Sequence, residues 1–220
     1  MSAGNADAPR FPDRRAAGRL LAGQLRDYAG RPDVVILGLP RGGVPVAYEV
    51  ALALEAPLDV LLVRKLGVPG HEELAFGAIA SGGVRVLNPE VVLAARVTAA
   101  QIKRVAAEQQ RELERREQLY RGGRTPLELA GRTAIIVDDG LATGATMRAA
   151  VQAVRQRQAH PVVAVPVAPV PTLDELSELA DSVLCLITPE EFVAVGRWYD
   201  RFAATEDEEV QELLAASARR

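Results

Sequence analysis

The richest chemistry in the sequence lies in two adjacent carboxylates, Asp138 and Asp139, followed by a short loop of small and hydroxylated residues. Small residues let the backbone approach a ligand closely, and the helix predicted to begin there offers unpaired N–H groups, so the loop suits a phosphate. The carboxylates would repel a phosphate and suit sugar hydroxyls or metal-bound waters instead. A ribose 5-phosphate satisfies both halves. The loop residues are Ala142, Thr143, Gly144, Ala145 and Thr146.

The run from Asp138 to Thr146 resembles, without a gap, the signature of type I phosphoribosyltransferases, in which two acids are followed by spacers and Thr-Gly-x-Thr. The resemblance implies that the acid pair holds the ribose 2- and 3-hydroxyls of phosphoribosyl pyrophosphate, and that residues 142–146 hold its 5-phosphate. It also implies Mg²⁺, held near Asp138 and Asp139 through substrate and water rather than by direct protein ligands. An ordinary strand–turn–helix with an acidic turn is the alternative. A Walker A loop is excluded, because its Gly-Lys-Ser/Thr ending is missing.

A second loop, Arg41-Gly42-Gly43, follows the first predicted sheet strand and precedes a predicted helix. Two glycines can expose consecutive amides, and an arginine fork can hold a diphosphate. Taken alone, such a segment could be a plain turn. It resembles the pyrophosphate loop of phosphoribosyltransferases, particularly the Arg-Gly-Gly forms of guanine and xanthine enzymes. The resemblance implies a cis peptide near Pro40 and Arg41.

A third segment, residues 63–70, resembles the start of the flexible loop of adenine phosphoribosyltransferases. Arg64 and Lys65 would then clamp the charge of departing pyrophosphate, although they could also simply end a strand. The polar stretch 67–74 is expected to be a mobile loop that closes over the site and excludes water. Ala75 stands where the adenine enzymes carry a loop acid. Glu72 and Glu73 could replace that acid, or they could simply face solvent, as exposed loop carboxylates usually do.

Aromatic residues gather near the C-terminus in a chain that contains few of them. Trp198, Tyr199 and Phe202 could stack on an acceptor base, as the hood segments of the family often do. Alternatively, Trp198 and Phe202 are four residues apart and could form one packing face of a helix. Residues 206–216 then predict an acidic amphipathic helix, with Thr205 as its N-cap.

These segments require a scaffold of alternating strands and helices. Helical spacing predicts helices beginning at Asp13 and over residues 44–54, 98–120 and 147–158. Apolar runs predict strands over residues 33–38, 58–64, 76–81, 84–87, 133–137, 161–166 and 182–187. This alternation predicts an α/β fold, Rossmann-like and similar to type I phosphoribosyltransferases, with a mostly parallel sheet, helices on both faces, a flexible loop and a small hood.

Residues 1–10 are predicted to be a disordered tail, and residues 11–220 a single domain. Within it we expect a core over about 33–187, a helical insertion over about 88–131 and a C-terminal hood or appendage over about 188–220. The charged helix 98–120 is predicted to be a surface or partner helix, because its acids and bases are interleaved.

Composition limits the partners and the compartment. With 26 basic and 29 acidic residues, the net charge of −3 gives no global reason to bind nucleic acid. The single cysteine, Cys185, cannot form an internal disulfide, and no apolar run approaches the roughly 18 residues that span a bilayer. We therefore expect a cytoplasmic protein with neither nucleic-acid nor membrane partners. A homodimer is a family-level expectation.

The resemblance implies a phosphoribosyltransferase of nucleotide metabolism, which transfers ribose 5-phosphate from phosphoribosyl pyrophosphate to a nitrogenous base or similar small acceptor and releases pyrophosphate. Asp138, Asp139, Arg64 and Lys65 are its expected catalytic residues. The alternative is a non-catalytic regulator that senses phosphoribosyl pyrophosphate on the same fold. A dehydrogenase-like Rossmann protein is disfavoured, because no Gly-x-Gly-x-x-Gly follows the first strand. The acceptor stays open, since Ala142 replaces the acid of hypoxanthine-guanine enzymes but matches the adenine enzymes.

Overall fold

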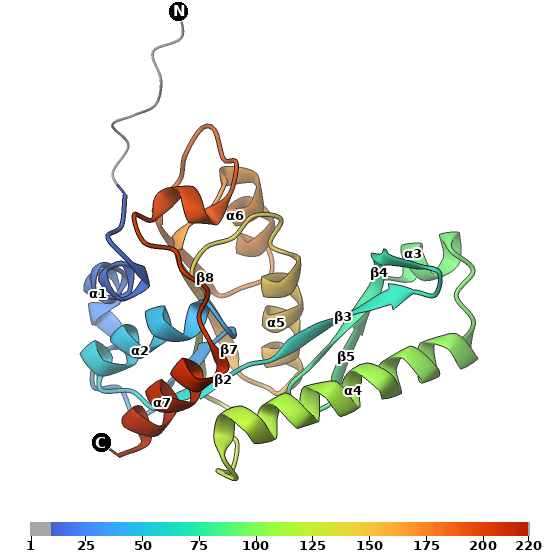
Figure 1. Ribbon diagram of the computed structural model, residues 1–220, viewed down its shortest axis with the longest axis horizontal. Helices are drawn as coiled ribbons and strands as arrows, with labels where there is room; N and C mark the ends of the chain where they lie inside the picture. Colours follow the sequence, from blue (N-terminus) through green and yellow to red (C-terminus); the bar gives the residue numbers. More distant parts are fainter. Residues whose placement is uncertain (1–9, 220) are drawn as a thin grey trace, which may run out of the picture.

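The computed structural model of the protein describes residues 10–219, so the tail expected over residues 1–10 lies, apart from Arg10, outside the described residues. Five parallel strands form the larger of two sheets, in the order β2-β1-β6-β7-β8 (Figure 1). This confirms the predicted α/β fold with a mostly parallel sheet. The strands are β1 (Val34–Gly38), β2 (Leu58–Val60), β6 (Thr133–Val137), β7 (His160–Val167) and β8 (Ser182–Ile187).

Helices cover both faces of the parallel sheet, and two separate hydrophobic cores result. One face carries α1 (Arg14–Gln24), α2 (Gly43–Leu54) and α7 (Asp207–Ala218). The other carries α5 (Ala145–Gln156) and α6 (Val170–Ser177). Short 3₁₀ helices lie at Arg26–Tyr28 and Val195–Trp198.

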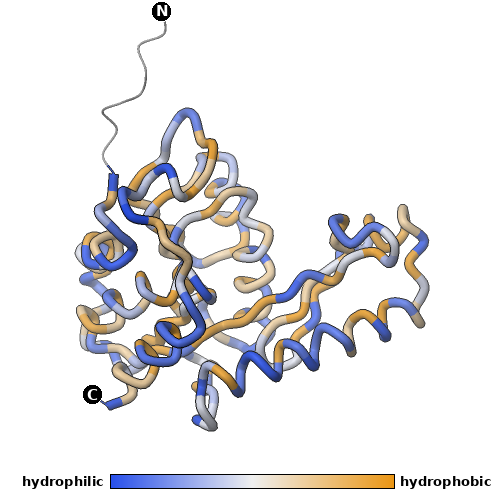
Figure 2. Tube along the Cα trace, viewed as in Figure 1, coloured by the Kyte–Doolittle hydropathy of each residue, from blue (hydrophilic) through white to orange (hydrophobic). Residues whose placement is uncertain are grey.

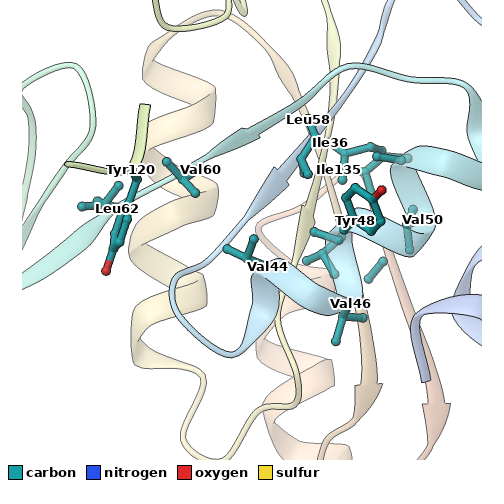
Figure 3. Packing of buried hydrophobic residues seen from close by; sticks show 14 of the residues in the cluster. Ile36, Val44, Val46, Tyr48, Val50, Leu58, Val60, Leu62, Tyr120 and Ile135 are labelled. Atoms are coloured by element: carbon teal, nitrogen blue, oxygen red, sulfur yellow. The ribbon is translucent and has the colours of Figure 1, made fainter. Parts of the chain in front are cut away.

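Alternation along the strands divides their side chains between the two cores. Ile36 of β1 and Ile135 of β6 pack on the α2 face, where Figure 3 shows them near Tyr48. Their chain neighbours Leu37 and Ile136 pack on the α5 face. Successive strand side chains point to opposite faces, so a strand covered on both sides reads as a continuous apolar run. This is why the strand before the acid pair is recognisable in the sequence.

The smaller sheet is antiparallel and extends away from the parallel one (Figure 1). We call it, with the two helices that follow it, the arm. It contains β3 (Val63–Val68), β4 (His71–Ala80), β5 (Val84–Leu87), α3 (Pro89–Ala94) and α4 (Ala99–Arg121).

The single strand predicted over residues 58–64 is wrong, because the chain changes sheets within it. Leu61 still donates its amide to the Gly38 carbonyl oxygen of the parallel sheet (3.0 Å). The next residue, Leu62, instead bonds to Ser81, which follows β4. Its amide donates to Ser81 Oγ (2.9 Å), and its carbonyl oxygen accepts from the Ser81 amide (2.9 Å). Both leucines are buried, so the apolar run continues through the change of sheet without a signal.

The stretch 67–74 differs from the loop expected there, since it forms the end of the β3–β4 hairpin. Gly70 makes the turn with φ +82°, and Gly67 passes so close that a Cβ would lie 2.6 Å from the Glu72 carbonyl oxygen. Apolar residues near the turn, including Val68 and Phe76, are buried in the same core as α4 residues such as Leu113. Packing against α4 therefore stabilises pairing that the polar sequence does not indicate.

The predicted charged helix is confirmed as α4, which is hydrophilic along most of its length (Figure 2). Thr98 and Gln101 form a capping box at its start, and Gly122, with φ +56°, ends it. The N-cap predicted for the last helix is wrong: Glu206 precedes α7, and Thr205 is buried. Within residues 10–219, no helix is both long and apolar enough to cross a bilayer.

Candidate active site

The two predicted phosphate loops begin side by side at one edge of the parallel sheet, because they follow the adjacent strands β1 and β6. Gly38 and Val137 are partners in the β1–β6 register, so the chains that follow them emerge side by side. A Cβ on Gly43 would lie 2.6 Å from the Val137 carbonyl oxygen, and one on Gly42 would collide with the Asp139 carboxylate. Glycine is needed for this close approach. The carboxyl edge of the strands is where open α/β sheets bind ligands.

The acid pair is held by contacts from three parts of the chain. The Asp139 amide donates to Asp138 Oδ1 (2.8 Å), which turns the first carboxylate back on the loop. Arg14 of α1 donates from Nε to Asp139 Oδ2 (2.8 Å). The Tyr199 hydroxyl donates to the Asp139 carbonyl oxygen (2.6 Å). The first helix and the C-terminal segment thus fix the second acid.

Burial governs the electrostatics of the pair. The pKa of Asp138 is raised well above its usual value of 3.8, first by burial and then by the charge of Asp139. Burial also raises the pKa of Asp139, while the hydrogen bond and charge of Arg14 oppose the rise. Two close carboxylates that cannot both ionise freely form a site that attracts hydrogen-bond donors and cations. Sugar hydroxyls and hydrated Mg²⁺ both have that character.

The loop at Arg41-Gly42-Gly43 has the cis peptide that the resemblance implied, between Pro40 and Arg41. The Gly43 amide, expected to face a ligand, donates instead to the Leu39 carbonyl oxygen (3.0 Å). The Arg41 guanidinium points to the start of α7, with Nη1 3.4 Å from Glu206 Oε2 and 3.9 Å from Asp207 Oδ1. Both pairs are exposed, so an incoming diphosphate could displace them.

Side chains from outside the loop 142–146 hydrogen-bond to its backbone. Gly144 is the N-cap of α5, with φ +67°, and a Cβ there would lie 2.6 Å from Thr172 Cγ2 of α6. Thr172 donates from Oγ1 to the Ala142 carbonyl oxygen (2.8 Å), and Arg148 donates to the Thr143 carbonyl oxygen (2.8 Å). These contacts fix the backbone while Ala142, Thr143 and Thr146 stay exposed. The exposed turn at the start of α5 suits an anion.

Arg64 reaches the same region from β3, whereas its exposed neighbour Lys65 does not line the space beside the loops. Arg64 lines a small cavity of about 50 Å³ together with Pro40 and Thr146 of the two loops. Arg64 and Lys65 also line a larger cavity of about 710 Å³ between the β3–β4 hairpin and α4. Arg64 Nε donates to Gln109 Oε1 of α4 (2.6 Å), so its orientation is set by the arm.

Glu72 gains no contact with the acid pair. Its pKa is lowered by hydrogen bonds from its own amide and from the Gly70 amide, so it remains ionised in the exposed hairpin turn. Its carboxylate therefore serves the turn in this structure. Ala75 lies in the same hairpin, within β4.

The aromatic residues near the C-terminus surround the second acid unequally. Trp198 and Tyr199 are 7% and 1% exposed, whereas Phe202 is 38% exposed. Phe202 stacks on Tyr199 with 5.0 Å between ring centroids, and the Arg14 guanidinium carbon lies 3.9 Å from its centroid. The packing face predicted for a helix containing Trp198 and Phe202 is wrong, because the 3₁₀ helix ends at Trp198.

Two contacts to the site were missed by the sequence analysis. Arg14 looked like one of several arginines on a packing helix, and nothing in the sequence separates it from Arg15 or Arg19. Only the fold brings it to Asp139. The pairing of Arg41 with the acids that begin α7 was also missed, because the two segments are 165 residues apart.

The donor set fits magnesium held mainly by a substrate. Among residues 10–219, no group of three or more His, Cys, Asp or Glu side chains could hold a metal ion. Mg²⁺ keeps several waters and commonly binds through one or two carboxylates together with substrate phosphates. Asp138 and Asp139 lie beside the loop at Gly42 and Gly43, where their carboxylates suit the waters of such an ion rather than the ion itself.

Comparison with known proteins places the chain among relatives. A family profile described as the phosphoribosyl transferase domain matches residues 12–197. In two strains of Mycobacterium tuberculosis, CDC 1551 and H37Rv, a protein provisionally named a phosphoribosyl transferase is 53% identical over 205 residues, which cover 93% of this chain and 46% of that protein. The chain thus spans about half the length of these curated relatives. The crystal structure of TT1426 from Thermus thermophilus has a TM-score of 0.83 at 44% identity, covering 94% of this chain and 98% of TT1426.

Proposed function

Because the chain belongs to the type I phosphoribosyltransferase family, we propose that it binds phosphoribosyl pyrophosphate with Mg²⁺ and transfers ribose 5-phosphate to a nitrogenous base or similar small acceptor. Pyrophosphate is the second product. One observation supports this most directly: the Asp138–Asp139 pair is flanked on one side by residues 142–146 and on the other by the loop at Gly42 and Gly43. A ligand with a phosphate at each end of a sugar fits this order.

Each part of the site has a role in the proposed reaction. Residues 142–146 bind the 5-phosphate, and the carboxylates of Asp138 and Asp139 accept hydrogen bonds from the ribose hydroxyls. The bond from C1 to the diphosphate oxygen breaks, and its electron pair leaves with pyrophosphate. The acceptor nitrogen forms the new bond to C1 and loses its proton to solvent. The carboxylates stabilise positive charge on the ribose ring during this exchange.

In this proposal Arg41 and Arg64 face the leaving group, whereas Lys65, expected to act with them, lines the cavity beside the hairpin and not the one beside the loops. Arg41 must exchange Glu206 and Asp207 for the diphosphate, which exposed ion pairs permit at little cost. Arg64 already lies beside both phosphate loops. Magnesium, when bound, would neutralise diphosphate charge.

In this proposal the acceptor binds at the C-terminal segment. Among Trp198, Tyr199 and Phe202, only Phe202 is substantially exposed, so its ring is the one proposed to contact a base. Stacking would require the Arg14 guanidinium, 3.9 Å from the ring centroid, to move aside, because Tyr199 already stacks on the ring. Tyr199 would support Asp139 through its hydroxyl, and Trp198 would support the segment from within the core.

Calorimetric titration with phosphoribosyl pyrophosphate and Mg²⁺ tests the binding site. We expect wild-type protein to bind, and the double variant Asp138→Asn, Asp139→Asn to lose about 100-fold or more in affinity, because each carboxylate hydrogen bond contributes roughly 1.5–3 kcal/mol. Asp33→Asn is the matched control, since Asp33 lies just before β1 and pairs with Arg31 instead. Circular dichroism checks that each variant is folded. Unchanged affinity in a folded double variant would defeat the assignment.

Pyrophosphate release against a panel of purine and pyrimidine bases then tests transfer. Release that depends on one base establishes the transferase and identifies its acceptor. Binding without release for any base supports the alternative, a sensor of phosphoribosyl pyrophosphate on the same fold. Absence of binding by the wild-type protein rejects both.

A further inference from the structure

Helix α4 reaches the phosphate loops, although none of the sequence motifs includes it. The cavity of about 50 Å³ beside the loops is lined by Pro40, Arg64 and Thr146, and also by Arg116 and Tyr120 of α4. Figure 3 shows the Tyr120 ring beside Leu62, which lines the same cavity. The charged helix therefore forms one wall of the space between the two loops.

The side chains that line this cavity favour an anion. Arg64 and Arg116 contribute two guanidinium groups, Thr146 contributes a hydroxyl, and no carboxylate is among the described lining residues. Arg64 is held by Gln109, a neutral partner, so its charge is not neutralised there. Arg116 donates from Nε to Glu112 Oε1 (2.9 Å), but a guanidinium has five N–H donors and retains several for a ligand.

Helix α4 is also anchored well enough to present a charge precisely. Arg121, five residues beyond Arg116, is buried against Asp59 of β2. The Tyr120 hydroxyl donates to Asp207 Oδ1 of α7 (2.6 Å), and together burial and this bond raise its pKa to about 12. The capping box at Thr98 fixes the other end of the helix. Groups on rigid helices hold a geometry better than groups on loops.

We propose that Arg116 is an additional residue that contacts the leaving group. Together with Arg64, it binds the diphosphate of phosphoribosyl pyrophosphate. This inference rests on the proposed function. When the bond from C1 to the diphosphate oxygen breaks, negative charge grows on that oxygen, and a second guanidinium beside it stabilises the charge. The proton balance is unchanged, because Arg116 stays protonated throughout.

A pair of neighbouring arginines gives a matched test. Arg115 also bonds Glu112, with Nε 2.8 Å from Oε2, but it is not among the residues that line the cavity. Arg116→Gln and Arg115→Gln therefore remove the same charge and the same ion-pair partner, and only the first removes a cavity cation. The probes are phosphoribosyl pyrophosphate, inorganic pyrophosphate with Mg²⁺, and ribose 5-phosphate, each titrated by calorimetry.

We expect Arg116→Gln to weaken phosphoribosyl pyrophosphate and pyrophosphate binding about tenfold, the loss of one charge-assisted hydrogen bond. Ribose 5-phosphate, which lacks the diphosphate, should bind within about twofold of wild type. Arg115→Gln should leave all three affinities unchanged. Arg116→Lys should recover part of the loss, because it restores a charge without the fork.

Two results would overturn the inference: equal pyrophosphate affinity in Arg116→Gln and Arg115→Gln, or an equal loss for ribose 5-phosphate. If Arg116→Gln does not fold, Arg116→Lys carries the comparison, with weakened pyrophosphate binding expected relative to wild type. Failure of the proposed function is distinct, since the wild-type protein would then bind neither phosphoribosyl pyrophosphate nor ribose 5-phosphate.

Discussion

The ionised carboxylate of Asp138 destabilises the folded protein. Its carboxyl is partly buried beside Asp139, and its pKa is raised well above 3.8 by that burial and by its neighbour's charge. At pH values between the unfolded and folded pKa, the folded state binds more protons than the unfolded state. Stability therefore falls as pH rises through this window, and the loss persists at neutral pH. The carboxylate proposed to bind the ribose thus lowers the stability of the folded protein.

Asp138→Asn should raise the melting temperature at pH 7.5 by a few degrees, since about 1 kcal/mol shifts the melting temperature by roughly 2–4 °C in a domain of this size. Asn keeps the oxygen that accepts from the Asp139 amide. The gain should shrink as pH falls and vanish below about pH 3, where wild-type Asp138 is protonated in both states. Thermal unfolding followed by circular dichroism from about pH 3 to pH 8 measures this. A lower melting temperature at pH 7.5 would contradict the electrostatic account.

Asp33→Asn is the opposite control for that series. The side-chain hydrogen bond from Arg31 lowers the pKa of Asp33 to about 2, below its usual 3.8. Its charge therefore stabilises the folded state above pH 3.8, and this contribution is lost as pH falls through the folded pKa. The variant should be less stable than wild type at pH 7.5, with the difference shrinking in acid.

Residue types and spacing predicted the acid pair and the glycine loops, because each motif is local in the sequence. The role of Arg14 was not predicted, because its hydrogen bond to Asp139 joins residues 125 positions apart and depends on how α1 packs on the sheet. Tyr199 was named as a base-stacking residue, but its hydroxyl bonds the Asp139 backbone. Sequence patterns indicate which groups could act, while tertiary contacts decide which of them meet.

Elements inside the parallel sheet were predicted well, because strands covered on both faces leave continuous apolar runs. The arm was predicted less well. The chain between β2 and β3 stays apolar while it changes sheets, and the 67–74 hairpin is polar at its turn. What stabilises the hairpin is α4, about 40 residues away, through apolar side chains such as Leu113 that are sparse among charges. Such pairing has no local signal.

The contact between the loop 142–146 and α6 predicts a specific loss of stability. Gly144→Ala must adopt a positive φ, which costs roughly 1–2 kcal/mol, and its Cβ would also press on Thr172. Gly122→Ala shares the positive φ, but its Cβ would meet no atom within 4 Å. Urea denaturation should show Gly144→Ala to be the less stable of the two by about 1–3 kcal/mol, the usual cost of overpacking.

The double variant Gly144→Ala, Thr172→Ser should recover part of the stability that Gly144→Ala loses. Serine lacks the Cγ2 that opposes the new Cβ, and it keeps a hydroxyl to donate to the Ala142 carbonyl oxygen. Equal stability of Gly144→Ala and Gly122→Ala would instead mean that the loop shifts freely away from α6.

At the scale of the whole molecule, the arm is joined to the parallel sheet by a buried ion pair. Arg121 of α4 and Asp59 of β2 are each 6% exposed, and Arg121 Nε lies 2.9 Å from Asp59 Oδ1. Arg121 also donates to the Val60 carbonyl oxygen (3.0 Å), and the Leu127 amide donates to Asp59 (3.1 Å). The pair thus connects the C-terminal end of the arm, and the segment that follows it, to the edge strand of the sheet.

Arg121→Met should destabilise the protein by about 3–5 kcal/mol, because it leaves the Asp59 carboxylate buried without a counter-charge. The double variant Asp59→Asn, Arg121→Met removes this pair, and Asn can still accept from the Leu127 amide, so it should recover part of that loss. Glu117, whose Oε1 lies 3.1 Å from Arg121 Nη1, loses its partner in both variants. Arg115→Met, which breaks an exposed pair on the same helix, should leave stability close to wild type. Urea denaturation measures all three. If the double variant were as unstable as Arg121→Met, the lost packing of the arginine and its lost pair with Glu117, rather than the unpaired Asp59 charge, would account for the instability.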